Sequence, residues 1–496
     1  MQGKLPLSLL SAALLAGFAV SYSQACTSVV VGKNASADGA VIISRNEDYF
    51  INNWNKRLVI HPRRDADKGE MITFKNGLKV AAPATLFRYT GLMDWNGDTT
   101  AADGPYEERG VNEYNLAISA TNSVDVNDAA KKADPLVDAG LIEADIPSLV
   151  LPQAKTAREA VALLGRVIKD QGAGEGNGII LADPDEAWYM EVGSGHQWIA
   201  VKVPQNKYLF VANGMRIHDV NLSDSANVMS SAGLADFVRQ NKLLDQVDEH
   251  HFNFAKAFGV TADTYNVDRE WMGQHMLSPS VQQKVRQDQY PLFMTPDSKI
   301  TIKDIASVLR ADFHGTELEN MKGADRPMGV DRTIETHIFE LRTGMPQALQ
   351  TLTWQSFGSR TGAVLVPMYE NAMREVPAVL RSGTDTYESQ SAFWAFRMNG
   401  TLAQTNMTKY GPVMAQWQNR IEGDFQAEVP AIDRMLNKLY QQNPDTALSF
   451  ANQWSNGNML WAVQSARDVN ASLITDMTKS TEKKYTPAEL EKIKSL

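Results

Sequence analysis

The chain has 496 residues, of which 43% are hydrophobic, and a net charge of −10 at pH 7. This composition is that of a globular protein with one large domain or two to three smaller ones. The acidic balance excludes nucleic-acid binding through phosphate neutralisation, and no run of basic residues opposes that conclusion.

The start of the chain differs from the rest. Lys4 is the only charge before Cys26, and the stretch after Lys4 is almost entirely apolar and small. Ser23 and Ala25 then place small residues three and one positions before Cys26, as in a secretory signal peptide. A membrane anchor is the alternative, but the apolar stretch is shorter than the roughly 20 residues that cross a bilayer. We expect residues 1–25 to be removed, leaving a periplasmic or secreted protein with no stable membrane insertion.

Cys26 is the only cysteine, and it directly follows the expected cleavage site. A single thiol in an oxidising compartment forms no internal disulfide. Cleavage would give this residue a free α-amine, whose pKa of about 8 suits a general base. Cys26 would then be a nucleophile that carries its own base. The alternatives are a small buried residue and a lipoprotein acylated at Cys26, although Ser23 and Gln24 fit a lipoprotein signal poorly.

The residues after Cys26 predict a β-hairpin. Strands are expected over 27–33 and 40–44, which are rich in β-branched and apolar residues, and the intervening NASADG is typical of a turn. The returning strand brings Arg45 and Asp48 back towards Cys26. A guanidinium there would favour the thiolate, and a carboxylate would orient the amine.

Further along the chain, strands and helices are both predicted. A turn and a strand are expected over 110–122, and a helix over 156–169 with Thr156 and Glu159 spaced as a capping box. Residues 178–213 predict a meander of antiparallel strands. The C-terminal quarter of the chain is helical in pattern and ends in a charged tail. The fold class is therefore α+β, with antiparallel sheets and layered helices.

Motifs for other chemistries are missing from the sequence. It contains no HExxH, CxxC or P-loop pattern, so metalloprotease and nucleotide-binding functions have no local support. The glycine-rich stretch 172–176 follows a helix and precedes a strand, which is the wrong order for dinucleotide binding. We expect neither a metal nor an organic cofactor.

Several motifs resemble the dipeptidase A family, a branch that also includes the secernins. They are CTSVVVGKNASADG, RNED, GVNEY, AISAT, ADPDEAWYMEV and GHQW, in chain order. The resemblance spans residues 26 to 369 and is most specific in its N-terminal third. It implies the N-terminal-nucleophile (Ntn) hydrolase fold, an αββα sandwich of two antiparallel sheets between helix layers, and peptidase action on dipeptides.

The signal-peptide pattern, the resemblance and the helical C-terminal pattern together predict a domain division. A signal peptide at 1–25 is followed by an Ntn-hydrolase catalytic domain at 26–370 and a helical C-terminal region at 371–496 that packs on it. The wider group includes bile-salt hydrolases and penicillin V acylases, which begin with the same cysteine and place arginine and aspartate on the second strand.

Three more site residues are implied by the resemblance. Asn122 is the expected oxyanion donor, since pre-oriented groups stabilise developing negative charge best. Asn213 would orient the amine together with Asp48, and Arg332 is the candidate for a later arginine of the site. The full set of expected catalytic residues is Cys26, Arg45, Asp48, Asn122, Asn213 and Arg332.

The expected reaction is hydrolysis of small peptides through an acyl-enzyme. The Cys26 amine takes the thiol proton, the thiolate attacks the carbonyl carbon, and water releases the acyl group. A dipeptidase should also hold a carboxylate near the nucleophile for the substrate ammonium, and Glu113 and Asp38 are candidates. Two alternatives stay open: an N-acyl amide hydrolase similar to penicillin V acylase or bile-salt hydrolase, and a non-catalytic lipoprotein. The oligomeric state also stays open, a homo-oligomer included.

Overall fold

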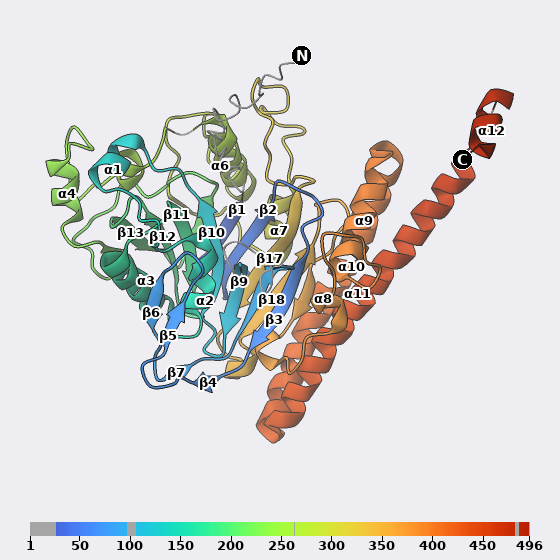
Figure 1. Cartoon of the computed structure of the whole chain (residues 1–496), viewed down its shortest axis with the longest axis horizontal. Helices are drawn as coiled ribbons and strands as arrows, with labels where there is room; N and C mark the ends of the chain where they lie inside the picture. The colour runs from blue at the N-terminus through green and yellow to red at the C-terminus, as the bar shows by residue number, and fades with distance from the viewer. Residues whose placement is uncertain (1–25, 97–105, 262, 482–485, 496) are drawn as a thin grey trace, which may run out of the picture.

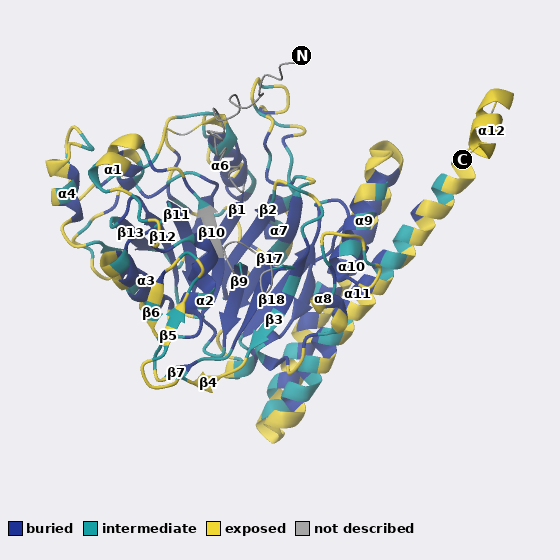
Figure 2. Cartoon of the chain, viewed as in Figure 1, coloured by how far each residue is buried: buried dark blue, intermediate teal, exposed yellow. Residues whose placement is uncertain are grey.

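The computed structural model describes residues 26–96, 106–261, 263–481 and 486–495, without the side chains of residues 120–122. The predicted signal peptide lies outside the described residues. Within them, two large antiparallel sheets of seven and eight strands lie between layers of helices (Figure 1). Figure 2 shows that the sheets are mostly buried, whereas the outer turns of the helices are exposed.

The predicted hairpin lies in the middle of the seven-stranded sheet. β1 pairs with β2, with Thr27 opposite Asn46. β2 continues to Asp48, beyond the predicted end at residue 44, because β17 pairs with it as far as Asp48. In spatial order, the strands are β16 (Phe293–Met294), β14 (Tyr208–Val211), β1 (Thr27–Val31), β2 (Val41–Asp48), β17 (Thr333–Leu341), β18 (Thr351–Phe357) and β19 (Val366–Met368).

The predicted meander over 178–213 belongs to the eight-stranded sheet, with one correction. β11, β12 and β13 are successive antiparallel neighbours, as expected. The last strand of the range, β14, instead crosses to the other sheet and pairs with β1. All of its residues are buried, which suits an interior strand with both faces covered. In spatial order, the strands are β15 (Val228–Ser230), β13 (Trp198–Lys202), β12 (Ala187–Val192), β11 (Asn177–Ala182), β10 (Ala117–Ser123), β9 (Glu107–Asn112), β8 (Tyr89–Asp94) and β3 (Lys56–His61).

Separate apolar cores join the layers. Between the sheets, Val30 and Ile43 of one sheet pack with Ile180 of the other. On the outer face of the eight-stranded sheet, the helix predicted over 156–169 is α3 (Ala157–Gln171), with Leu164 in the core. On the outer face of the seven-stranded sheet, the long C-terminal helices share one core with the strands. The predicted αββα sandwich is therefore confirmed.

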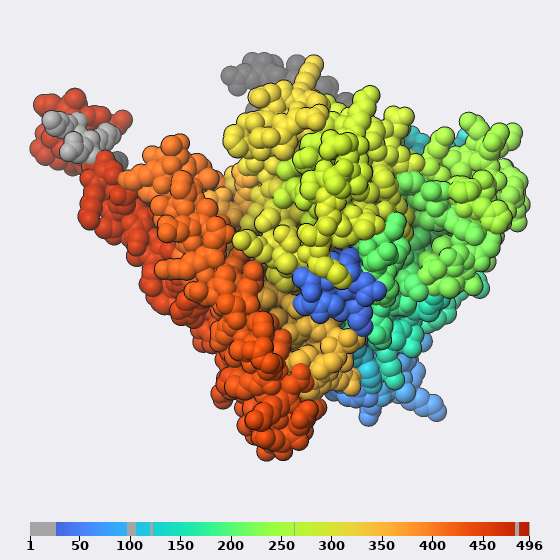
Figure 3. All heavy atoms as spheres, turned by 180° about the vertical axis from the view of Figure 1, so that it is seen from behind, coloured from blue at the N-terminus to red at the C-terminus, as the bar shows by residue number. Residues whose placement is uncertain are grey.

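The C-terminal helices α10 and α11 run along one side of the molecule, as Figure 3 shows from behind. Among the described residues, no helix is both long enough and apolar enough to cross a membrane.

Two small sheets pair β4 (Arg64–Asp65) with β7 (Thr85–Leu86), and β5 (Met71–Thr73) with β6 (Lys79–Ala81). The other helices are α1 (Asp128–Ala133), η1 (Glu143–Asp145), α2 (Ile146–Val150), α4 (Leu234–Gln240), α5 (Phe254–Phe258), α6 (Thr264–Leu277), α7 (Ile302–Arg310), η2 (Gln347–Leu349), η3 (Glu370–Ala372), α8 (Ala378–Arg381), α9 (Ala392–Gln404), α10 (Met407–Gln442), α11 (Pro444–Ser480) and α12 (Pro487–Lys494).

Candidate active site

The alternation of side chains along the hairpin decides which residues meet at its open end. Val30 and Ile43 point into the core between the sheets. Side chains two residues apart share a face, so Cys26 and Arg45 point to the same interior. The strand register places Arg45 opposite Ser28, and a long side chain reaches the diagonal neighbour Cys26 from there.

The Arg45 guanidinium contacts the sulfur of Cys26 directly. Its Nη2 donates to Sγ at 2.7 Å, and its Nη1 donates to Oε2 of Glu108 at 2.6 Å. The same Nη2 lies 3.4 Å from Oε1 of Glu143. Both Cys26 and Arg45 are fully buried. The structure therefore brings the thiol, a cation and two carboxylates together at the head of β1.

The environment of Cys26 favours the protonated thiol. The pKa of this thiol is raised to about 12, mainly by burial, which Arg45 offsets only in part. The carboxylates of Glu143, Glu108 and Asp48 contribute to the increase. Since the thiol is protonated at neutral pH, attack on a carbonyl carbon requires a base that takes its proton.

Asp48 lies on the other face of β2, towards the helix layer. It accepts hydrogen bonds from the Arg326 guanidinium and from the Thr333 hydroxyl. Its side chain is fully buried. Asp48 thus lies close enough for its charge to raise the Cys26 pKa, while its own carboxylate is held by an arginine and a hydroxyl.

A second arginine reaches the head of β1 from α6. Nη1 of Arg269 donates to the carbonyl oxygen of Cys26 at 2.7 Å and to Oγ1 of Thr27 at 3.0 Å. Its Nη2 donates to Oδ1 of Asn213 at 2.9 Å. Burial and the nearby charge of Arg326 lower the pKa of Arg269 to about 9. Asn213 is therefore linked to the Cys26 backbone through Arg269.

The other two expected catalytic residues are placed differently. Asn122 lies on β10, and its side chain is outside the described part of the chain. Arg332 donates through Nη2 to the hydroxyl of Tyr265 at 2.8 Å. Arg45 and Arg269 contact Cys26, and Arg326 contacts Asp48. Arg332 contacts Tyr265 instead.

The carboxylates suggested for the substrate ammonium lie away from Cys26, which corrects that expectation. Asp38 lies in the β1–β2 turn, at the opposite end of the hairpin, where it lines a cavity of about 660 Å³. Glu113 follows β9 and pairs with Arg63 at 2.7 Å. A hairpin necessarily separates its turn from its open end. The structure instead places Glu143 beside the thiol.

Sequence reasoning missed Glu108, Glu143 and Arg269 because each comes from a distant segment. Two signals could have found part of this set. The charges at 107–109 begin a strand whose residues are all buried. The charges at 268–270 lie in a helix and are likewise buried. Adjacent opposite charges within a buried strand or helix indicate buried ion pairs, since isolated buried charges are too costly to keep.

Comparison with known proteins identifies the family. The sequence model of peptidase family C69 matches residues 25–420. The chain therefore belongs to peptidase family C69, and it is a hydrolase of the peptidase class.

Individual relatives agree with this assignment. A probable dipeptidase of Latilactobacillus sakei is 32% identical over 464 residues, covering 92% of this chain and 96% of the relative. A probable dipeptidase of Salmonella dublin is 37% identical over 363 residues, covering 71% and 82%. A mutant conjugated bile acid hydrolase of Clostridium perfringens matches with a TM-score of 0.30 and 13% identity, over 74% of this chain and 98% of that one. The family model and the two probable dipeptidases confirm the family resemblance predicted from the sequence.

Proposed function

We propose that the chain is an exported dipeptidase whose nucleophile is Cys26, exposed as the N-terminal residue when residues 1–25 are removed. The observation that carries the proposal is the contact of 2.7 Å between Sγ of Cys26 and Nη2 of Arg45, at the head of a buried strand. Family membership and relatives named as probable dipeptidases support dipeptide hydrolysis.

The N-terminal amine is the base in this mechanism. The thiol pKa of about 12 means that Arg45 alone does not ionise Cys26 at neutral pH. An α-amine with a pKa of about 8 on the same residue can accept the proton within hydrogen-bond reach. The thiolate then attacks the scissile carbonyl carbon. The protonated α-amine of Cys26 gives its proton to the amine leaving group.

The acyl-enzyme is the intermediate of the proposed reaction. Attack forms the bond between sulfur and carbon, and collapse of the tetrahedral species breaks the peptide bond. Asn122 is retained as the proposed oxyanion donor on β10. Water, deprotonated by the same amine, then releases the first amino acid and regenerates the thiol.

Glu143 is the proposed partner of the substrate ammonium. In a dipeptide, one carbon atom separates the ammonium from the scissile carbonyl carbon, so the charge lies close to the nucleophile. Oε1 of Glu143 and Sγ of Cys26 both neighbour Nη2 of Arg45. Oε2 of Glu143 accepts from the Ser123 hydroxyl at 2.9 Å, which fixes the carboxylate. A buried ammonium without such a partner would be costly.

The test compares kcat/KM for free dipeptides, their N-acetylated forms, penicillin V and glycine-conjugated bile salts. A dipeptidase should prefer free over N-acetylated dipeptides by roughly a hundredfold or more, because acetylation removes a paired charge. Glu143→Gln should remove most of this preference while the N-acetylated dipeptides keep their rate. The control is Glu186→Gln, because Glu186 lies on the turn before β12 and pairs with surface residues. Faster turnover of the N-acyl substrates by the wild-type enzyme would assign the chain to the acylases instead.

A further inference from the structure

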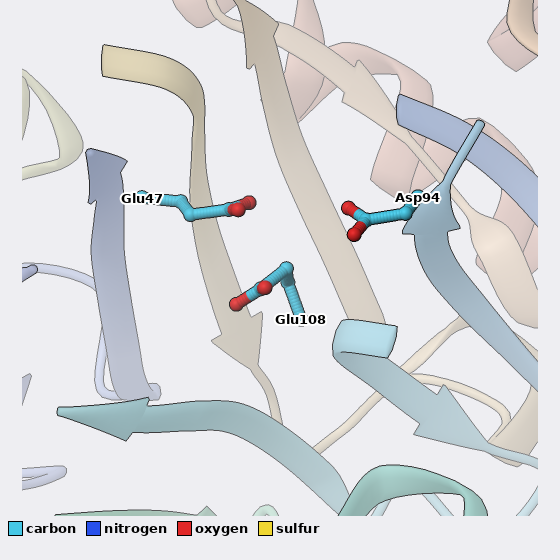
Figure 4. Close-up of side chains that lie close together, drawn as sticks. All are labelled: Glu47, Asp94 and Glu108. Atoms are coloured by element: carbon cyan, nitrogen blue, oxygen red, sulfur yellow. The ribbon is translucent and has the colours of Figure 1, made fainter. Parts of the chain in front are cut away.

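Three carboxylates converge in the interior between the two sheets, close to Arg45. Figure 4 shows that Glu47, Asp94 and Glu108 point towards one another from different strands. Glu47 belongs to β2 of one sheet, whereas Asp94 and Glu108 belong to β8 and β9 of the other. One oxygen from each residue lies within 4.8 Å of the others. Such a group would fit a divalent cation by its ligand chemistry.

The chain itself supplies a cation to this group. Nζ of Lys56, on β3, lies 2.7 Å from Oε1 of Glu47 and 3.4 Å from Oε1 of Glu108, and it contacts Asp94. The Lys56 side chain is fully buried. Lys56 donates hydrogen bonds to Asp94 and Glu108 and lies within ion-pair distance of Glu47, so one lysine can hold all three carboxylates. The acidic cluster is thus a charge network rather than an unpaired set of acids.

Glu108 joins this network to the thiol. Its Oε1 faces Lys56, while its Oε2 accepts from Nη1 of Arg45 at 2.6 Å. Burial and the charge of Glu108 raise the pKa of Glu47 well above its ordinary value. Burial also acts to raise the pKa of Glu108, but Lys56 and Arg45 outweigh it and bring the pKa below its ordinary value. The surroundings therefore favour the negative charge on Glu108 over Glu47, and Glu108 is the acceptor for Nη1 of Arg45.

A β-bulge explains why Glu108 points to the interior. The pairing of β8 with β9 shifts by one residue between Leu92 and Met93, which oppose Arg109 and Glu107. Glu108 is the extra residue at that shift. A bulge re-aims a side chain that strict alternation would send to the other face. Glu108 and the neighbouring Arg109 consequently both make contacts between the sheets.

We propose that Glu108 and Lys56 are positioning residues for the reaction, and the proposal rests on Cys26 as the nucleophile. Lys56 holds Glu108, and Glu108 fixes the Arg45 guanidinium so that Nη2 meets the Cys26 sulfur. A guanidinium is a planar fork, so anchoring Nη1 sets the direction of Nη2. Without this anchor, Arg45 is free to turn towards Glu143, its other carboxylate neighbour.

The main test variant shortens the side chain of Glu108 without changing its charge. Glu108→Asp keeps the carboxylate but withdraws it by one methylene, and Lys56→Met removes the cation that holds it. The matched control is Glu370→Asp. Glu370 pairs at 2.7 Å with Arg109, which lies next to Glu108 on β9, and both side chains are fully buried. Circular dichroism and urea unfolding give the folded fraction of each variant, to which the rates are normalised.

The readouts are kcat, KM and the rate at which iodoacetamide alkylates Cys26 at pH 7, followed by intact mass. Glu108→Asp should lower kcat and the alkylation rate roughly a hundredfold, as expected when a reacting group is misplaced by about 1 Å. KM should change by less than about threefold, because the substrate contacts are untouched. Lys56→Met should change both rates in the same direction, and Glu370→Asp should leave them at the wild-type values.

The alkylation rate separates this proposal from the proposed function, because it needs no turnover. If Glu108 acted only through its charge, Glu108→Asp would alkylate like the wild-type enzyme, and the positioning role would be wrong. Equal losses in Glu108→Asp and Glu370→Asp would also overturn it, since a general loss of core packing would then explain both. Turnover that persists after Cys26 is alkylated would refute the proposed function, whereas the alkylation rates would still report the position of Arg45 relative to the sulfur.

Discussion

Arg45→Ala gives the largest expected change in the reactivity of Cys26. The substitution removes the cation that contacts the sulfur at 2.7 Å and leaves Glu108 and Glu143 close to it. Both carboxylates raise the thiol pKa, so the thiolate loses the stabilising charge of Arg45 and keeps the two destabilising charges. The fraction of thiolate at neutral pH should therefore fall.

The magnitude follows from the Coulomb energy. Two unit charges about 4 Å apart interact by about 4 kcal/mol at an effective dielectric constant near 20. Arg45 is fully buried, so solvent screens this interaction little. Since about 1.4 kcal/mol corresponds to a factor of ten, the thiolate fraction should fall by roughly a hundredfold to a thousandfold.

The assay measures alkylation of Cys26 by iodoacetamide between pH 6 and 9, because the thiolate is the reacting species. Arg342→Ala is the matched control, since it removes a buried arginine directly after β17 that pairs with Asp433 of α10 at 2.6 Å. Arg45→Ala removes a partner of the buried Glu108 and should lose about 3–5 kcal/mol of stability. Arg342→Ala should lose less, because Asp433 is only partly buried and keeps the hydrogen bond from the Tyr369 hydroxyl. Only Arg45→Ala should slow alkylation. Equal alkylation rates in Arg45→Ala and the wild-type enzyme would refute the role assigned to this guanidinium.

Three further outcomes are expected. Cys26→Ala should abolish turnover, and iodoacetamide but not EDTA should inactivate the wild-type enzyme; inactivation by EDTA alone would contradict a metal-free thiol mechanism. Burial raises the pKa of Glu191 from 4.5 to about 7, so the stability that its protonated form contributes is complete below pH 4.5 and is lost as the pH rises through 7. Urea unfolding should accordingly find Glu191→Gln more stable than the wild-type enzyme by up to about 3 kcal/mol at pH 8 and no more stable at pH 4. Thr156→Ala removes the hydroxyl that accepts from the Glu159 amide at 3.2 Å, and it should cost about 1 kcal/mol in the same assay.

The parts of the site that could be predicted from the sequence are local. The hairpin after Cys26 follows from a short turn between two apolar strands, and its alternation brings Arg45 to the cysteine. The start of α3 follows from Thr156 and its spacing to Glu159. In each case the residues that interact are close in the chain, so their spacing determines which side chains meet.

The rest depends on contacts between distant segments, which the spacing of residues does not encode. Arg45 meets Glu108 across 63 residues and Glu143 across 98, and Arg269 meets Cys26 across 243. The transfer of β14 to the other sheet and the bulge at Glu108 depend on which strands become neighbours. The prediction of Asp38 as an ammonium partner was wrong, because Asp38 lies in the turn of the hairpin whereas Cys26 lies at its open end.

The central claim is that Cys26 becomes a free N-terminal residue, and the mature N-terminus tests it most directly. The protein should be isolated from the periplasm or culture medium of a secreting host, then analysed by N-terminal sequencing and intact mass. The account predicts the sequence Cys-Thr-Ser-Val and a mass equal to that of residues 26–496. A chain that begins elsewhere, or a Cys26 that carries an acyl group, would contradict it.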